Sequence, residues 1–250
     1  MDNTNNDINK SQSLLSDKAI LKHMEKGTVV ISPFIRENLS TSSYDVTLGP
    51  YFYREKVPEP GQGIYNPYSE SMVKKVWGEY QVAEKVKDWS LRSGQKLENI
   101  DDDDYIIWIK PGETILGHTN EFIGGNTTVT TMMKARSSLG RNFIEVCKCA
   151  GWGDVGYTSR WTMEITNNSL SYSIPLVVFR RIAQIIFFDT EGIVGPSYES
   201  SGKYQVSNDV DVLKTKWHPT DMLPKMYKDK EIKQKHQYLS LDDYIIAKQL

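Results

Sequence analysis

The feature that most constrains the fold is a series of short apolar runs separated by Gly, Pro and Asn, in a region with almost no helical periodicity. The runs are Thr28–Ser32, Asp45–Leu48, Tyr105–Lys110, Thr114–Gly117, Thr127–Met133, Trp161–Thr166, Pro175–Phe179 and Ile182–Phe188. Turn signals lie between some of them, at Pro111-Gly112 and Gly124-Gly125-Asn126. Many short strands at regular spacing predict an all-β sandwich or barrel.

One short helix is predicted ahead of these strands. Ser16 can cap a helix over residues 16–26, and Gly27 follows its end. A second helix is expected near Asp221–Lys235, in a charged C-terminal stretch. The expected organisation is a disordered leader (1–14), one domain (15–206) with an insertion at about 55–104, and a C-terminal extension (207–250).

Composition excludes several classes of protein. Thirty Lys and Arg against 32 Asp and Glu leave a net charge of −2, so no bulk charge favours binding to a nucleic-acid polymer. The two cysteines, Cys147 and Cys149, are too few for a disulfide framework or a four-cysteine zinc site. No apolar run approaches the roughly 20 residues that span a bilayer. With no signal-peptide pattern, we expect a cytoplasmic protein without a membrane partner.

One motif suggests zinc, but only in part. His23-Met24-Glu25 matches the H-x-E half of a zinc deaminase signature, which also needs P-C-x-x-C. Cys147-Lys148-Cys149 has the wrong spacing and no preceding proline. We therefore expect no zinc.

Two polar segments follow predicted strands. Lys134–Arg141 contains two arginines, two serines and a glycine, a set that suits phosphate oxygens but also suits a solvated turn. Cys149–Tyr157 places three glycines around Asp154 and two aromatic residues, which predicts either a tight loop that admits a flat ring or a long hairpin connection.

Two further positions carry candidate functional side chains. Trp161–Thr166 alternates, so Glu164 lies on the polar face of a strand whose other face is apolar. By default such a face is only solvated. Gly202-Lys203-Tyr204-Gln205 comes after the last strand, where a mobile lid could supply a phosphate-binding lysine.

Taken in order, these segments resemble the deoxycytidine triphosphate (dCTP) deaminase family of the dUTPase-like superfamily. The matching segments are Ser42–Gly49, Pro111–Gly117, Arg136–Arg141 (the family's R-S-S-L-G-R), Ala150–Tyr157, Glu164 at the position of the catalytic glutamate, Arg181–Gln184 and Gly202–Gln205. The resemblance covers about Leu15–Gln205, without the insertion.

The resemblance implies a distorted jelly-roll or β-clip fold of the dUTPase-like type, with a short N-terminal helix and a partly helical C-terminal tail. It implies a homotrimer with active sites between subunits and zinc-independent deamination of dCTP to dUTP and ammonia. Mg²⁺ would enter with the nucleotide triphosphate. The implied ligands are dCTP and dUTP, with dTTP as a candidate inhibitor.

The resemblance also implies roles for single residues. Glu164 would be the general base, Ser137 and the carbonyl of Ala150 would position the water, and Arg141 would orient Glu164. The implied substrate-binding residues are Arg136, Ser138, Asp154, Tyr157, Gln184, Tyr198, Lys203 and Gln205. Of these, Asp154 would accept the 3′-hydroxyl, and Tyr157 would disfavour a ribose.

The sequence departs from the family at two places that bear on function. Gly153 replaces an apolar residue before Asp154, and the family's glycine-rich tail is missing after Gln205. Three alternatives stay open: a dUTP pyrophosphatase, which would use Asp154 to activate water; a bifunctional deaminase and pyrophosphatase; and a non-catalytic nucleotide-sensing trimer. Only deamination needs Glu164.

Overall fold

The computed structural model describes residues 13–205 and 207–233. It begins with the predicted helix, α1 (Asp17–Glu25), whose capping residue Ser16 accepts a hydrogen bond from the amide of Ala19 at 3.4 Å. Ile20 anchors the helix in the core. Ser13 and Leu14 were expected in a disordered leader, and this is wrong for both. The amide of Asp189 donates to Ser13, and Leu14 bridges to Phe188. Residues 1–12 lie outside the described residues.

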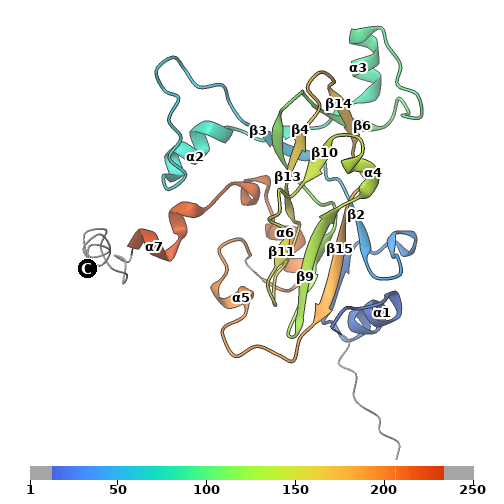
Figure 1. Cartoon of the computed structure of the whole chain (residues 1–250), viewed down its shortest axis with the longest axis vertical. Coiled ribbons are helices and arrows are strands. Elements are labelled where there is room, and N and C mark those ends of the chain that lie inside the picture. Colours follow the sequence, from blue (N-terminus) through green and yellow to red (C-terminus); the bar gives the residue numbers. More distant parts are fainter. Residues whose placement is uncertain (1–12, 206, 234–250) are drawn as a thin grey trace, which may run out of the picture.

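A four-stranded antiparallel sheet lies in the lower part of the molecule as Figure 1 shows it. Its order is β11 (Trp152–Gly153), β9 (Val129–Ala135), β15 (Arg181–Asp189) and β2 (Tyr44–Thr47). β11 and β2 are therefore opposite edges of one sheet. This separation decides where the candidate site residues lie.

A five-stranded sheet continues the structure. Its order is β10 (Ile144–Val146), β13 (Thr162–Asn167), β7 (Thr114–His118), β3 (Tyr51–Arg54) and β4 (Gln81–Val82). β13 lies between β10 and β7, with Glu164 opposite Leu116. Pairing on both sides fixes the face to which each β13 side chain points.

Two three-stranded sheets complete the fold. One consists of β1 (Val29–Ser32), β8 (Phe122–Gly125) and β12 (Thr158–Ser159), and the other of β14 (Ile174–Val177), β6 (Tyr105–Ile109) and β5 (Glu84–Lys85). The main core lies among the sheets and includes the fully buried Tyr44, Ile115, Met163, Ile165 and Phe187. Burial of such side chains stabilises the fold by about 1.5–3 kcal/mol each.

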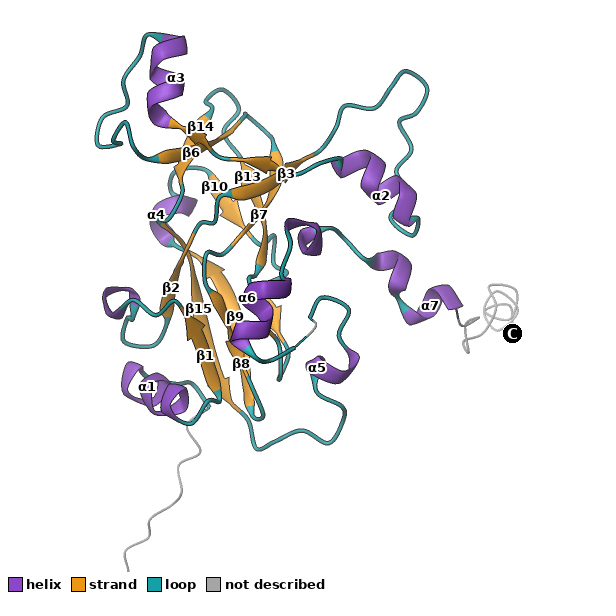
Figure 2. Cartoon of the chain, turned by 180° about the vertical axis from the view of Figure 1, so that it is seen from behind, coloured by secondary structure: helices purple, strands orange, loops and turns teal. Residues whose placement is uncertain are grey.

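The insertion has structure of its own, and its two helices lie apart (Figure 2). α2 (Glu70–Trp77) precedes β4 and packs in a cluster with β3 and β7, whereas α3 (Val86–Ser93) follows β5 and packs on β6 and β14. The short helix η1 (Arg36–Asn38) lies beside β2, and α4 (Ser137–Gly140) follows β9.

The C-terminal part is partly helical, as predicted. It contains α5 (Tyr198–Ser201), α6 (Val210–Lys216), η2 (Pro219–Met222), η3 (Met226–Lys228) and α7 (Lys230–Lys233). A continuous helix over Asp221–Lys235 is wrong for the described residues, because Pro224 follows η2 and a proline inside a helix removes a hydrogen bond. α6 packs beside β8, and η2 lies against β7 (Figure 2).

The turn predicted at Gly124-Gly125-Asn126 is also wrong in part. Gly124 and Gly125 belong to β8, which pairs with β1 and β12, and the turn lies one step later at Asn126–Thr128. A Cβ on Gly124 would collide with the backbone of Tyr157 and Thr158. These glycines allow three strands to approach closely.

The predicted fold class is confirmed, since the chain is mainly β-sheet with a short N-terminal helix and a partly helical C-terminal part. Each of the predicted strands is present. The strands that the sequence pattern missed are β3, β8, β10, β11 and β12, together with β4 and β5 of the insertion. In the described part of the chain, no helix has the length and apolar character needed to cross a membrane.

Candidate active site

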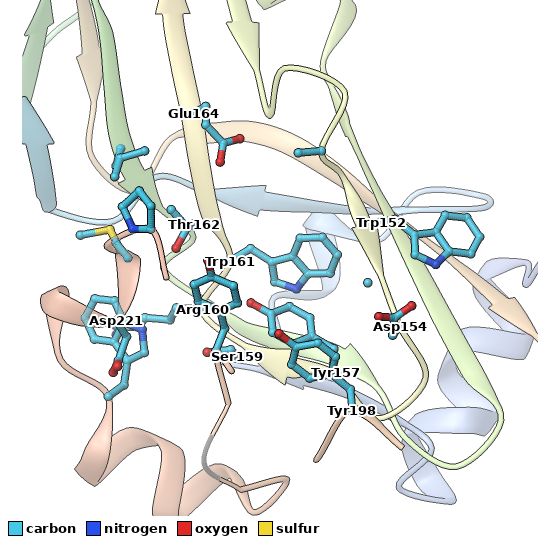
Figure 3. A pocket seen from close by; sticks show the side chains of 17 residues that line it. Trp152, Asp154, Tyr157, Ser159, Arg160, Trp161, Thr162, Glu164, Tyr198 and Asp221 are labelled. Carbon is cyan, nitrogen blue, oxygen red and sulfur yellow. The ribbon is translucent and has the colours of Figure 1, made fainter. Parts of the chain in front are cut away.

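A cavity of about 340 Å³ opens at the β11 edge, and we call it the Glu164 cavity (Figure 3). Its lining comes from the segment from Ala150 to Thr162, from strands β13 and β7, and from the C-terminal part. Its polar and aromatic lining includes Trp152, Asp154, Tyr157, Ser159, Arg160, Trp161, Thr162, Glu164, Tyr198, Tyr204, Trp217 and Asp221.

Glu164 reaches this cavity because β13 alternates. Met163 and Ile165 are fully buried, and Glu164 points to the other face, where its half-buried carboxylate faces the cavity (Figure 3). Burial raises the pKa of Glu164 above its ordinary value, partly opposed by a backbone hydrogen bond and by the charge of Lys148. By default such a strand face is only solvated, but here a single chain half buries the Glu164 side chain.

Asp154 and Tyr157 lie on the connection from β11 to β12. The amide of Tyr157 donates to the carbonyl of Asp154 at 2.9 Å, and Gly156 adopts a φ of 90° that favours glycine. The ring of Tyr157 packs edge-on against Trp161 at 5.2 Å and Tyr198 at 5.1 Å. The Tyr157 ring is therefore packed between two other rings, and the exposed Asp154 carboxylate lies on the same connection.

Ala150 lines the same cavity after an unusual stretch of backbone. Cys147, Cys149 and the intervening Lys148 all have positive φ, at 69°, 68° and 35°. Left-handed backbone costs about 1–2 kcal/mol per non-glycine residue, so the local chain is strained where it delivers Ala150 to the cavity.

Gly153 is explained by its neighbour Trp161. A Cβ at position 153 would come within 2.6 Å of the Trp161 ring, and it would also collide with the hydroxyl of Thr131. The indole of Trp161 is fixed by a 2.9 Å hydrogen bond from Nε1 to the carbonyl of Ile123. Only glycine fits beside this ring.

A second group of predicted residues lies elsewhere, at the β2 edge. Asp45 is 3% exposed and accepts from Arg181 Nη1 at 3.1 Å and from Gln184 Nε2 at 2.9 Å, while Arg136 Nε lies at 3.4 Å. We call these four residues the Asp45 cluster. Ser137, Ser138 and Arg141 are exposed on or beside α4. None of these side chains lines the Glu164 cavity.

Lys203 and Gln205 also lie off the cavity. Lys203 forms an ion pair with Asp229. The buried amide of Gln205 accepts from the Thr158 amide at 2.7 Å and donates to the Gly156 carbonyl at 2.8 Å. In this arrangement Gln205 joins the C-terminal part to β12. Of the predicted residues, the structure therefore brings together Glu164, Ala150, Asp154, Tyr157 and Tyr198.

Several residues that line the cavity were not predicted from the sequence. Arg160 has the same parity as Thr162 and Glu164, so extending the alternation by two residues would have found it. Its guanidinium lies 4.8 Å from the Phe122 ring and 4.8 Å from the Trp217 ring, and its buried Nε has no hydrogen-bond partner within the described residues. Trp217, Asp221, Met222 and Pro224 had no signal, because they reach the cavity only through tertiary packing.

The part of the zinc motif on α1 has a local structural role. Nδ1 of His23 lies 2.8 Å from the hydroxyl of Thr28, which follows the helix. The residues that the structure describes contain no group of three or more His, Cys, Asp or Glu side chains placed to hold a metal ion.

Comparisons of the sequence with known proteins indicate one family. Residues 14–190 match the family described as dCTP deaminase-like. A protein of Methanococcus aeolicus named "dCTP deaminase, dUMP-forming" is 30% identical over 208 residues, which cover 79% of this chain and 95% of that protein. A protein of the same name from Methanocaldococcus jannaschii is 28% identical over 203 residues, with 79% and 93% coverage. The crystal structure of 2′-deoxycytidine 5′-triphosphate deaminase from Agrobacterium tumefaciens aligns with a TM-score of 0.48 at 17% identity, over 72% of this chain and 50% of that one.

Proposed function

Since the chain belongs to the dCTP deaminase-like family, we propose that it is a hydrolase that removes the 4-amino group of dCTP, with Glu164 as general base. The observation that carries this proposal is the half-buried Glu164 carboxylate, which has a raised pKa and shares one cavity with Asp154 and Tyr157. A carboxylate with a raised pKa is a stronger base than an exposed one.

The reaction would proceed through addition of water. Glu164 takes one proton from water as the oxygen bonds to C4 of cytosine, and it passes that proton to N3. It then moves the hydroxyl proton of the adduct to the amino group, which leaves as ammonia while the C4 carbonyl forms. Water and dCTP thus give dUTP and ammonia. The Ala150 carbonyl and Ser137 would position the water, and Arg141 would stabilise developing charge.

The remaining roles concern binding. Asp154 would accept the 3′-hydroxyl of deoxyribose, and the Tyr157 ring, held by Tyr198, would leave no room for a 2′-hydroxyl. Arg136, Ser138, Lys203 and Gln205 would hold the phosphates, and Gln184 would support that side through Asp45. For Lys203 and Gln205, this role requires release from Asp229 and from β12.

We further propose a homotrimer. Glu164, on β13, faces the cavity that opens beside β11, while the segment from Arg136 to Arg141 follows β9 and begins at the Asp45 cluster, at the β2 edge. One chain therefore presents two parts of the proposed site on different sides. Assembly in which the α4 region of one chain faces the cavity of the next would join them.

Mg²⁺ is proposed as part of the substrate, because it would reduce the charge of the triphosphate. In this role phosphate oxygens of the nucleotide, and not protein side chains, would hold the ion. A chelator should stop turnover, and added Mg²⁺ should restore it, as measured by ammonia release. Activity that needs zinc instead would contradict the proposal.

A second candidate, a bifunctional enzyme, is favoured by the names of the relatives, which describe dUMP as the product. Asp154 would then activate a second water that cleaves dUTP to dUMP and pyrophosphate. As a separate proposal, dTTP is a candidate inhibitor.

Product analysis separates these functions. The protein is incubated with dCTP or with dUTP, and dUTP, dUMP, ammonia and pyrophosphate are quantified. Ammonia with dUTP indicates deamination alone, and ammonia with dUMP and pyrophosphate indicates both steps. Cleavage of dUTP without ammonia from dCTP would indicate a pyrophosphatase. Binding without either product would leave a nucleotide sensor and refute the proposal.

A further inference from the structure

The insertion and the C-terminal extension meet in one apolar cluster next to the Glu164 cavity. From the insertion come Val73 and Trp77, one helical turn apart on α2. From the extension come Met222 and Leu223, which are buried, and Trp217 packs beside them. Tyr53 and Leu116, on strands β3 and β7, form the base of this cluster.

The same extension forms one wall of the cavity. Trp217, Met222 and Pro224 contribute to its lining, together with the Asp221 carboxylate, which lies across the cavity from Asp154 (Figure 3). Trp217 also covers one face of the Arg160 guanidinium, which lines the cavity too. A ligand that fills this cavity would therefore contact side chains of the same extension that packs against the insertion.

The extension is attached at more than one point. Just before the extension begins, the side chain of Gln205 binds the backbone of Thr158 and Gly156. Further along, the amide of Lys225 donates to the hydroxyl of Tyr204 at 3.0 Å. These polar contacts fix where the extension begins and turns. Met222 and Leu223 make apolar contacts instead, in the cluster that they share with α2, β3 and β7.

We propose that α2 of the insertion is a positioning element for substrate binding: Val73 and Trp77 hold the extension so that Trp217, Asp221 and Met222 form the outer wall of the Glu164 cavity. This inference rests on the proposed function only for the identity of the ligand, dCTP. It gives the insertion a role in substrate affinity and none in the chemical step.

A matched control exists within the insertion itself. Val86 begins α3 and is as buried as Val73, each being 1% exposed. Val86, however, packs with Ile106 and Val177 in a different cluster, which does not line the Glu164 cavity. Val73→Ala and Val86→Ala therefore remove the same two carbons at equal burial, and only the first change weakens the cluster under the extension.

The experiment measures steady-state deamination of dCTP and hydrogen exchange of the amides of Trp217, Leu223 and Lys225 in the full-length protein. We expect Val73→Ala to raise exchange at these amides and to raise KM by about tenfold, with kcat changed by less than about twofold. Val86→Ala should leave KM and these amides as in the wild type.

Three results would overturn the proposal: unchanged exchange in Val73→Ala, faster exchange with unchanged KM, or an equal rise of KM in Val86→Ala. If the wild type does not deaminate dCTP at all, the proposed function fails and this inference does not. Equilibrium binding of dCTP would then replace KM, with the same outcomes deciding.

Discussion

Two carboxylates of the molecule, Asp45 and Glu164, are placed in opposite surroundings. Asp45, on the edge strand β2 of the four-stranded sheet, is enclosed by two arginines and a glutamine amide. Glu164, on β13 of the five-stranded sheet, faces the cavity that opens beside β11. It is half buried, and among residues 13–205 and 207–233 it forms no ion pair within 4 Å. Asp45 has its lone pairs occupied by donors, whereas Glu164 keeps an affinity for a proton. The first carboxylate holds strands together, and the second is suited to proton transfer.

The strongest test of this contrast is Glu164→Gln. Glutamine keeps the shape but cannot accept a proton, so ammonia release from dCTP should fall by about 10²–10⁴-fold or more while dCTP binding survives. Single-turnover measurement of ammonia and equilibrium dCTP binding check the two parts. Near wild-type turnover would show that Glu164 is not the general base and that Glu164 and Asp45 do not differ in this function.

Mixing two variants tests whether one active site contains Arg141 from one chain and Glu164 from another. Arg141→Ala and Glu164→Gln should each be inactive alone. After subunit exchange of an equal mixture, about one quarter of the sites would combine two intact halves in a symmetric oligomer and should recover activity. Unmixed samples treated in the same way are the control. A mixture that stays inactive, or a fully active monomer in light scattering, would contradict a site shared between chains.

Asp45→Asn tests the structural role of the Asp45 cluster. The change weakens charge-assisted hydrogen bonds to Arg181 and Arg136, and the half-exposed Arg181 contributes little through its charge. We expect the free energy of unfolding to fall by about 1–2 kcal/mol, as measured by urea denaturation. A loss of ammonia release with unchanged stability would instead place Asp45 in the catalytic machinery.

The smallest expected effect is a change of stability with pH. The pKa of Glu164 is raised in the folded state, so the folded protein binds this proton more tightly than the unfolded chain does. The free energy of unfolding therefore falls as the pH rises from about 4.3, the pKa of Glu in the unfolded chain, through the raised pKa of the folded state. Glu164→Gln should therefore raise Tm slightly at pH 7 and leave it unchanged below about pH 4. Equal Tm shifts at both pH values would show that burial does not penalise the Glu164 charge.

The fold was predictable where burial follows local pattern. Alternation placed Glu164 on the polar face because Met163 and Ile165 must both enter the core. The same rule would have placed Arg160, had it been extended. Gly124 and Gly125 were misread because glycine marks both turns and close strand contacts.

The walls of the candidate site were not predictable in the same way. Trp217 and Met222 stand in a stretch without β-periodicity, and only packing against α2 and β7 brings them to the cavity. The family motif implies that Gln205 binds substrate, and nothing in the local sequence indicates that its amide binds Thr158 and Gly156. Long-range partners of single side chains leave no trace in the neighbouring residues.

The contact between position 153 and Trp161 links two residues that cannot be exchanged one at a time. A larger side chain at 153 has no volume to occupy while the indole is present, and a smaller side chain at 161 would leave a void that glycine does not fill. The space beside Gly153 of β11 is filled by the indole of Trp161, which directly precedes β13. A substitution at either position therefore requires a compensating substitution at the other. Engineering of this part of the Glu164 cavity has to change residues 153 and 161 together.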